Sequence, residues 1–142
     1  MKSSVRAEIS KKNKYWLERH RFHELRQFCL QYDYWKRMLH TIDGLAKPPL
    51  KDDILLQKKI KDVCSDPTVE AVIMREYYQK RISMLEDVAK RTDSIIGNYI
   101  LKGVTQNKSY DVLCAFERVP CGKDMYYELY RKFFWLLDDI RG

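Results

Sequence analysis

Apolar residues recur at steps of three and four along the first part of the chain, from about residue 13 to residue 42. The spacing is carried by Phe22, Leu25, Cys29, Tyr32, Trp35, Leu39 and Ile42. Such a period places the side chains on one face of a helix. The pattern therefore predicts a single long amphipathic helix over residues 13–42, with Gly44 as its stop.

A second long helix is predicted beyond a proline-containing connection. The connection is "LAKPPL", residues 45–50, where the prolines lack amide hydrogens and push the residues before them out of the helical region. A weaker helix is predicted over residues 51–63. Asp66 can cap the next one and Pro67 suits its first position. It runs to about Arg91, with Tyr78, Ile82, Leu85 and Ala89 at helical spacing.

Three shorter helices are predicted after Thr92 and Asp93, whose oxygens can cap the first of them. They cover the segment "SIIGNYILKGV" as far as Gly103, residues 110–117 with Ser109 as the cap, and residues 123–140. The turn-like "TQNK" precedes Ser109, and "VPCG" separates the last two helices. No segment shows the alternation of a strand.

The predicted fold is therefore all-α. A long antiparallel helical hairpin occupies residues 1–91, because neighbouring long helices commonly pack antiparallel. A three-helix helix-turn-helix region follows over residues 92–142 and packs as one globular unit.

The last predicted helix carries two apolar rows. One row is Tyr126, Leu129, Phe133, Leu136 and Ile140, and its neighbour is Tyr130, Phe134 and Leu137. Rows of this kind usually form core, so packing is predicted for Phe133, Leu136 and Leu137 in particular. The remaining face begins with Lys123, Asp124, Tyr127 and Arg131, at the positions where a recognition helix meets DNA.

The chain has a formal net charge of +7, with 27 basic and 20 acidic residues. This excess favours a polyanionic partner. Residues 1–50 hold eleven basic and five acidic side chains, whereas residues 101–142 hold seven and six. The helix-turn-helix region is thus close to neutral, and the charge excess lies in the N-terminal stretch.

That stretch, "KKNKYWLERHRFHELR", interleaves basic and aromatic side chains. Its cations are Lys11, Lys12, Lys14, Arg19, Arg21 and Arg26. A helix with this face could follow a phosphate backbone. The same face could equally be solvated surface, and the sequence leaves both interpretations open.

No pattern indicates an enzyme, a metal site or a bound cofactor. The cysteines at 29, 64, 114 and 121 lack two-residue spacing, and the pair His20 and His23 is too few for a zinc site. There is no Ser-His-Asp arrangement and no phosphate-binding glycine loop. Because no secretory signal and no apolar stretch of about 20 residues is present, we expect a reduced, soluble, cytoplasmic protein with no membrane partner.

The layout "ILKGVTQNKSYDVLCAFERVPCGKDMYYELYRKFFWLL" resembles the C-terminal helix-turn-helix of small phage transcriptional regulators of the RinA and ArpU type, which are themselves similar to the promoter-reading region of sigma factors. The likeness is strongest in "CGKDMYYELYRKFF". Gly122 falls on the cap, Lys123 on a basic position, Tyr126 and Tyr127 on a tyrosine pair, and Arg131 and Lys132 on the later basic run. Gly122 replaces the usual hydroxyl cap, and Asp124 stands where a basic residue is commoner.

The resemblance implies a sequence-specific, DNA-binding transcriptional regulator that activates late phage genes in the cytoplasm of a bacterial host. Double-stranded DNA is then the partner, host RNA polymerase a further candidate partner, and a homodimer is expected because one recognition helix reads only about 3 to 5 base pairs. The DNA-binding candidates are Lys123, Asp124, Tyr127, Arg131 and Lys132, with Lys108 and Ser109. The alternative is a compact helical interaction module, such as a phage protein that binds and inhibits a host protein.

Overall fold

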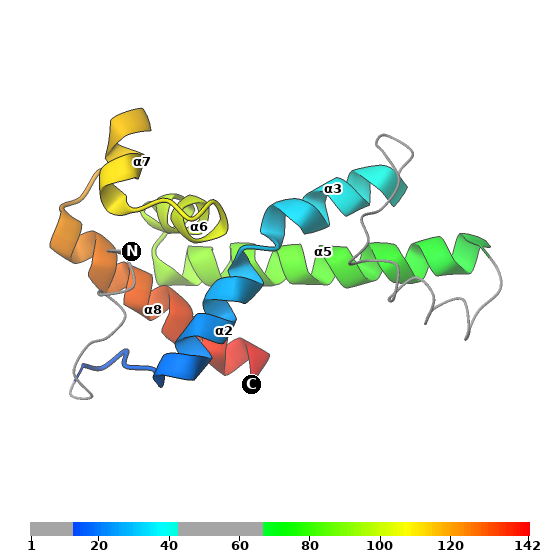
Figure 1. Ribbon diagram of the computed structural model, residues 1–142, viewed down its shortest axis with the longest axis horizontal. Coiled ribbons are helices and arrows are strands. Elements are labelled where there is room, and N and C mark those ends of the chain that lie inside the picture. The colour runs from blue at the N-terminus through cyan, green and yellow to red at the C-terminus, as the bar shows by residue number, and fades with distance from the viewer. Residues whose placement is uncertain (1–12, 43–66) are drawn as a thin grey trace. The chain divides into compact units, whose positions relative to one another are not determined.

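A computed structural model describes residues 13–42 and 67–142. Its elements are α2 (Arg19–Cys29), α3 (Tyr32–Ile42), α5 (Pro67–Thr92), α6 (Gly97–Thr105), α7 (Tyr110–Phe116) and α8 (Lys123–Arg141) (Figure 1). All regular elements in these ranges are helices, so the all-α prediction is confirmed for them. The helix predicted over residues 51–63, the Asp66 cap, Lys11 and Lys12 lie outside the described residues.

The chain divides into two compact units. Among the described residues, one unit comprises residues 13–31 together with residues 85–142, and the other comprises residues 32–42 and 67–84. Helix α5 contributes to both. The boundary predicted between residues 91 and 92 falls inside the first unit, which joins the N-terminal helix to the C-terminal helices.

The prediction of one helix over residues 13–42 is wrong, because α2 and α3 are separate helices. Helix α2 starts late because the Glu18 carboxylate caps it, accepting hydrogen bonds from the amides of His20 and Arg21 at 3.0 and 3.2 Å. It ends in a tightened turn, in which the Gln31 amide donates to the Phe28 carbonyl at 3.2 Å. Neither Gly nor Pro marks this break, and the apolar spacing continues across it.

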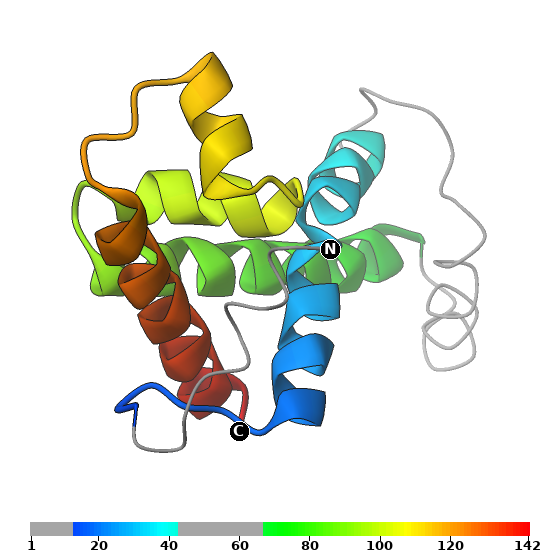
Figure 2. The ribbon, with the colours of Figure 1, turned by 60° about the vertical axis from the view of Figure 1, so that its left-hand side comes forward.

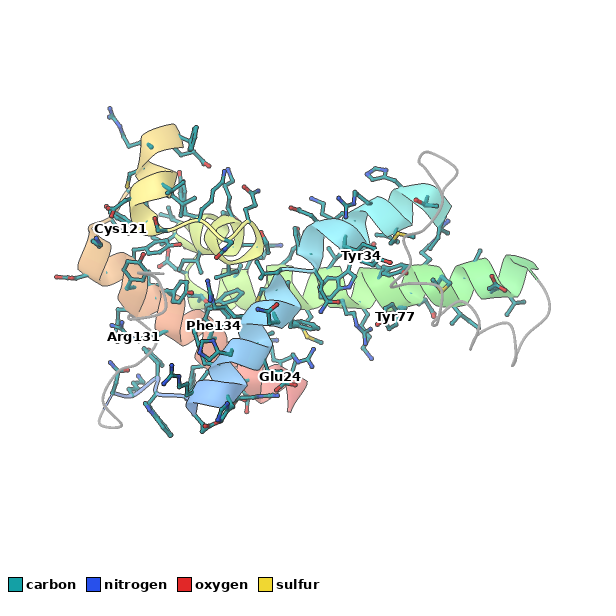
Figure 3. The ribbon with its side chains drawn as sticks, viewed as in Figure 1. Glu24, Tyr34, Tyr77, Cys121, Arg131 and Phe134 are labelled. Atoms are coloured by element: carbon teal, nitrogen blue, oxygen red, sulfur yellow. The ribbon has the colours of Figure 1, made fainter. Side chains whose placement is uncertain are left out.

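The second unit contains α3 and residues 67–84 of α5. The rings of Tyr34 and Tyr78 meet edge to face, with their centroids 6.4 Å apart, and so join α3 to α5. On α5, the Arg81 guanidinium lies 3.7 Å from the centroid of the Tyr77 ring (Figure 3). The unit's buried apolar side chains are Tyr32, Trp35, Met38, Met74, Tyr78 and Ile82.

The first unit is built around the aromatic face of α8. Helix α8, red in Figure 2, contacts both α2 (blue) and α6 (yellow-green). Phe22 of α2 packs on Phe134 with ring centroids 4.9 Å apart, and Tyr130 lies 5.1 Å from Phe134. Burying such rings stabilises a fold by about 1.5–3 kcal/mol each. The buried side chains of α8 are Tyr126, Tyr127, Tyr130, Phe133, Phe134 and Leu137.

Asp93 shapes the connection from α5 to α6. Its carboxylate accepts hydrogen bonds from the amides of Ile95 and Ile96 at 2.9 and 2.7 Å. Thr92, the other predicted cap, instead donates its hydroxyl to the Val88 carbonyl at 2.8 Å. Only Asp93 therefore acts as the cap that the sequence predicted.

Asp93→Ala is expected to lower the free energy of unfolding by about 1 kcal/mol near neutral pH, since a capping carboxylate is lost. The backbone hydrogen bond from Ile96, followed by that from Ile95, lowers the pKa of Asp93 below its ordinary value of 3.8. The stabilisation is therefore complete above that value and is lost as the pH falls through the lower native pKa. Urea unfolding at pH 7 and pH 3 measures this, with the exposed Asp87→Ala as the control. A wild-type advantage that is no smaller at pH 3 than at pH 7 would contradict a charged cap at Asp93.

Candidate nucleic-acid interface

Helices α7 and α8 form the candidate interface, joined by the turn at residues 117–122. Ser109 caps α7, as predicted, by accepting a hydrogen bond from the Val112 amide at 3.3 Å. The Tyr110 hydroxyl donates to the carbonyl of Cys121, in the turn, at 2.7 Å. The Tyr110 amide donates to the hydroxyl of Tyr127 at 3.2 Å. These bonds fasten the start of α7 both to the turn and to α8.

The opening of α8 is exposed and its continuation is buried. Gly122 is the N-cap and makes no side-chain hydrogen bond there. Residues 122–125 are all exposed, whereas Tyr126 and Tyr127 directly after them are buried. The first turn of this helix is therefore accessible, and the aromatic rings behind it are anchored in the core.

Tyr127 was predicted on the accessible face, and the structure corrects this. Its side chain is only 4% exposed, and its ring packs 5.6 Å from that of Tyr130. Tyr127 belongs to the helical row of Tyr130 and Phe134, which lie three and seven residues further on. Tyr127 therefore packs in the core and does not lie on the accessible face of α8.

The predicted core positions of α8 are confirmed in part. Phe133 and Leu137 are buried, whereas Leu136 is only half-buried and Ile140 is exposed. The buried face of α8 thus includes Tyr127, whereas Leu129 and Leu136 lie at the edge of that face.

Carboxylates accompany two of the cations on α8. The Lys123 ammonium lies 3.2 Å from the Asp111 carboxylate of α7, and the Arg131 guanidinium lies 2.6 Å from Glu128. The Arg131 side chain is 16% exposed, so that it is held close to the protein (Figure 3). Asp124 is exposed, and Lys132 is half-buried. The opening of α8 therefore presents charges of both signs.

The N-terminal cations differ in their surroundings. Lys14 and Arg19 are exposed. Arg21 pairs with Asp138 and Glu24, and these hydrogen bonds, led by that of Asp138, raise the pKa of Arg21. Arg26 instead donates to the side-chain oxygen of Asn107 at 2.8 Å. Arg21 thus attaches α2 to α8, whereas Arg26 reaches the loop between α6 and α7.

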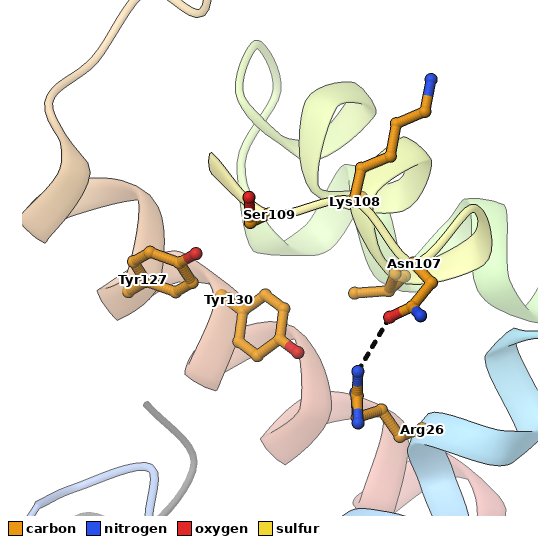
Figure 4. Close-up of a pocket in the computed structure, with 8 residues that line it drawn as sticks. Arg26, Asn107, Lys108, Ser109, Tyr127 and Tyr130 are labelled. Carbon is orange, nitrogen blue, oxygen red and sulfur yellow. Dashed lines mark hydrogen bonds between the residues drawn. The ribbon is translucent and has the colours of Figure 1, made fainter. Parts of the chain in front are cut away.

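Arg26 and that loop enclose a narrow recess, called here the Arg26 recess (Figure 4). It brings together Arg26 from the N-terminal candidates with Lys108 and Ser109 from the helix-turn-helix candidates. Its walls are Arg26, Gly103, Val104, Asn107, Lys108, Ser109, Tyr127 and Tyr130. The recess has room for about one water molecule.

Asn107 and Tyr130 were not among the predicted site residues. Asn107 has a φ of 55°, a left-handed conformation that asparagine tolerates better than most residues. The only sequence feature that could have pointed to Asn107 was its position in the turn-like segment "TQNK". Tyr130 appears in the sequence only as a core position, and its hydroxyl points toward Arg26 (Figure 4).

No cluster of three or more metal-binding side chains occurs in residues 13–42 and 67–142. None of the described helices combines the length and the apolar character that crossing a bilayer requires. Comparisons with protein-family models, curated proteins and solved structures found no match to the chain.

Proposed function

We propose that this chain is a phage-type transcriptional regulator that binds double-stranded DNA through α7 and α8. The observation that carries the proposal is the contrast along α8, where residues 122–125 are exposed and the rings that follow are buried. A recognition helix needs a first turn free to enter the major groove and a remainder held firmly by the core. The hydrogen bonds of Tyr110 supply a fixed geometry between α7 and α8.

The ion pair between Lys123 and Asp111 is compatible with binding DNA. Its two side chains are 43% and 73% exposed, and exposed pairs contribute only about 0–1 kcal/mol. A DNA phosphate can therefore take the place of Asp111 beside Lys123 at little cost. Activation of late genes, contact with host RNA polymerase and a homodimer on paired half-sites follow from the family resemblance and belong to the same proposal.

Titration of a fluorescent random-sequence duplex tests the DNA-binding step. We expect a Kd on the order of micromolar at 50 mM salt, weakening by about a thousandfold at 200 mM if roughly six phosphates are contacted. Lys123→Gln should flatten the slope of log K against log salt by about 0.9. Lys80→Gln removes an exposed charge from the other unit and serves as the matched control. Absence of binding at 50 mM salt by the folded chain would refute the proposal.

A protein-interaction module is the second candidate, and one observation favours it. Large apolar side chains are exposed on α7 and at the start of α8, with Phe116 75% exposed, Met125 53% and Val112 41%. Such side chains commonly contact another protein. Failure of the duplex titration by a folded chain would favour this candidate, whereas steeply salt-dependent binding would favour the DNA-binding one.

A further inference from the structure

The Arg26 recess combines two cations with neutral hydrogen-bonding groups and contains no carboxylate in its walls. This composition differs from the opening of α8, where Asp111 and Glu128 pair with the nearby cations. In the part of the chain that the structure describes, the Arg26 guanidinium hydrogen-bonds to the neutral side chains of Asn107 and Tyr130 and pairs with no carboxylate. Its positive charge is therefore not neutralised within the fold.

Several donors of the recess remain available to an acceptor. A guanidinium has five N–H groups, and the bonds to Asn107 and Tyr130 use only two of them. That bond occupies the Asn107 oxygen, so the amide NH₂ of the same side chain can still donate. Ser109 accepts from the Val112 amide, which leaves its hydroxyl proton for another acceptor. Among the described residues, these three side chains thus line one recess, each with a donor available, and no carboxylate competes for these donors.

Two neighbours reinforce this environment. The Lys108 side chain extends away from Arg26 (Figure 4), and its ammonium lies 5.2 Å from the centroid of the exposed Phe116 ring. It adds a second positive charge on the same loop. Burial raises the pKa of Tyr130 to about 12, with Arg26 acting in the opposite direction, so its hydroxyl stays protonated near neutral pH. The recess therefore carries no negative charge at physiological pH.

We infer that Arg26, together with Asn107 and Ser109, binds a backbone phosphate of DNA at the mouth of the recess. The site is too narrow inside for a phosphate group, so the oxygens would meet the donors at its rim. Side-chain donors from Arg, Asn and Ser are common phosphate ligands in DNA complexes and set the position of the protein on the duplex. This inference rests on the proposed function and adds α2 to its binding surface.

The test compares Arg26→Gln with Arg21→Gln in the salt-dependent duplex titration. Both changes remove one positive charge from α2, but Arg21 is already paired with Asp138 and Glu24. Arg26→Gln should reduce the salt slope by about 0.9, so that the ratio of variant to wild-type Kd shrinks about 3.5-fold between 50 and 200 mM salt. Arg21→Gln should leave the slope unchanged. Arg26→Lys keeps the charge and should restore the wild-type slope.

Circular dichroism melting of each variant establishes whether it is folded at the titration temperature. If Arg26→Gln is unfolded, Asn107→Asp provides the second variant, because a carboxylate at that position would neutralise the Arg26 guanidinium to which the Asn107 side chain is bonded. It should lower the slope as well. Equal slopes for the wild type, Arg26→Gln and Asn107→Asp would overturn the phosphate site and leave the proposed function standing. Failure of the wild-type chain to bind the duplex would overturn both.

Discussion

Replacing Gly97 by alanine is expected to lower the free energy of unfolding by about 3 kcal/mol, the upper end of the cost of overpacking a core. Gly97 is the first residue of α6, and a Cβ added there would overlap the backbone carbonyl of Ala89 on α5. A backbone atom cannot turn aside as a flexible side chain can. The helices α5 and α6 must therefore separate, and the packing of α6 on α8 is disturbed with them.

Urea unfolding followed by circular dichroism measures the effect. Gly122→Ser is the matched control, because a Cβ at Gly122 meets nothing within 4 Å. A serine there would also supply the side-chain cap that α8 lacks and add a few tenths of a kcal/mol. If Gly97→Ala and Gly122→Ser unfold at the same urea concentration, then Gly97 is not required for the close approach of α6 to the Ala89 backbone of α5.

Gly103→Ala is expected to destabilise the protein by about 2 kcal/mol, because the methyl group would enter a filled site. The added Cβ would overlap the Tyr126 hydroxyl and approach the Lys108 carbonyl at 3.1 Å. Tyr126 is fully buried, and its hydroxyl has no hydrogen-bond partner within the described residues. Tyr126→Phe should therefore be neutral or stabilising by up to about 1 kcal/mol, since it removes a buried polar group without a partner.

A double-mutant cycle tests the contact directly. In the Tyr126→Phe background, Gly103→Ala should lose at least half of its destabilising effect, because the overlapping oxygen has gone. Part of the cost remains, since the Lys108 carbonyl stays in place. Strictly additive effects of the two substitutions would show that a Cβ at position 103 does not clash with the Tyr126 hydroxyl. Gly103→Ala should also weaken the proposed DNA binding, because Gly103 lines the Arg26 recess together with Asn107 and Ser109.

Much of the helical content followed from local signals in the sequence. The Ser109 cap, the start of α8 after Gly122 and the link at Asp93 were predicted from residue types whose side chains or backbone act within a few positions. The break between α2 and α3 was not predictable in this way. Leu30 and Gln31 favour no turn, and the apolar spacing continues across them, so the break reflects packing of the two helices in different units.

The candidate site was predictable only as a set of residue types. Assignment of Tyr127 to the surface failed because two adjacent rows on α8 are both apolar, and the period alone does not say where the buried face ends. The Arg26 recess could not be predicted from the sequence for a different reason. Arg26 and Asn107 are separated by 81 residues, and no local pattern reports a contact over such a distance.

The first unit is assembled from helices that are far apart in the chain, and this affects its synthesis. Helix α2 leaves the ribosome before α8, whose rings cover it and which is translated about 90 residues later. At translation rates of about 5–20 residues per second, that interval is roughly 5 to 20 seconds. During this interval, Phe22 and its apolar neighbours remain exposed to solvent, which favours binding by chaperones. A fragment starting at residue 92 would lack α2, so the apolar face of α8 would be exposed to solvent and would promote aggregation.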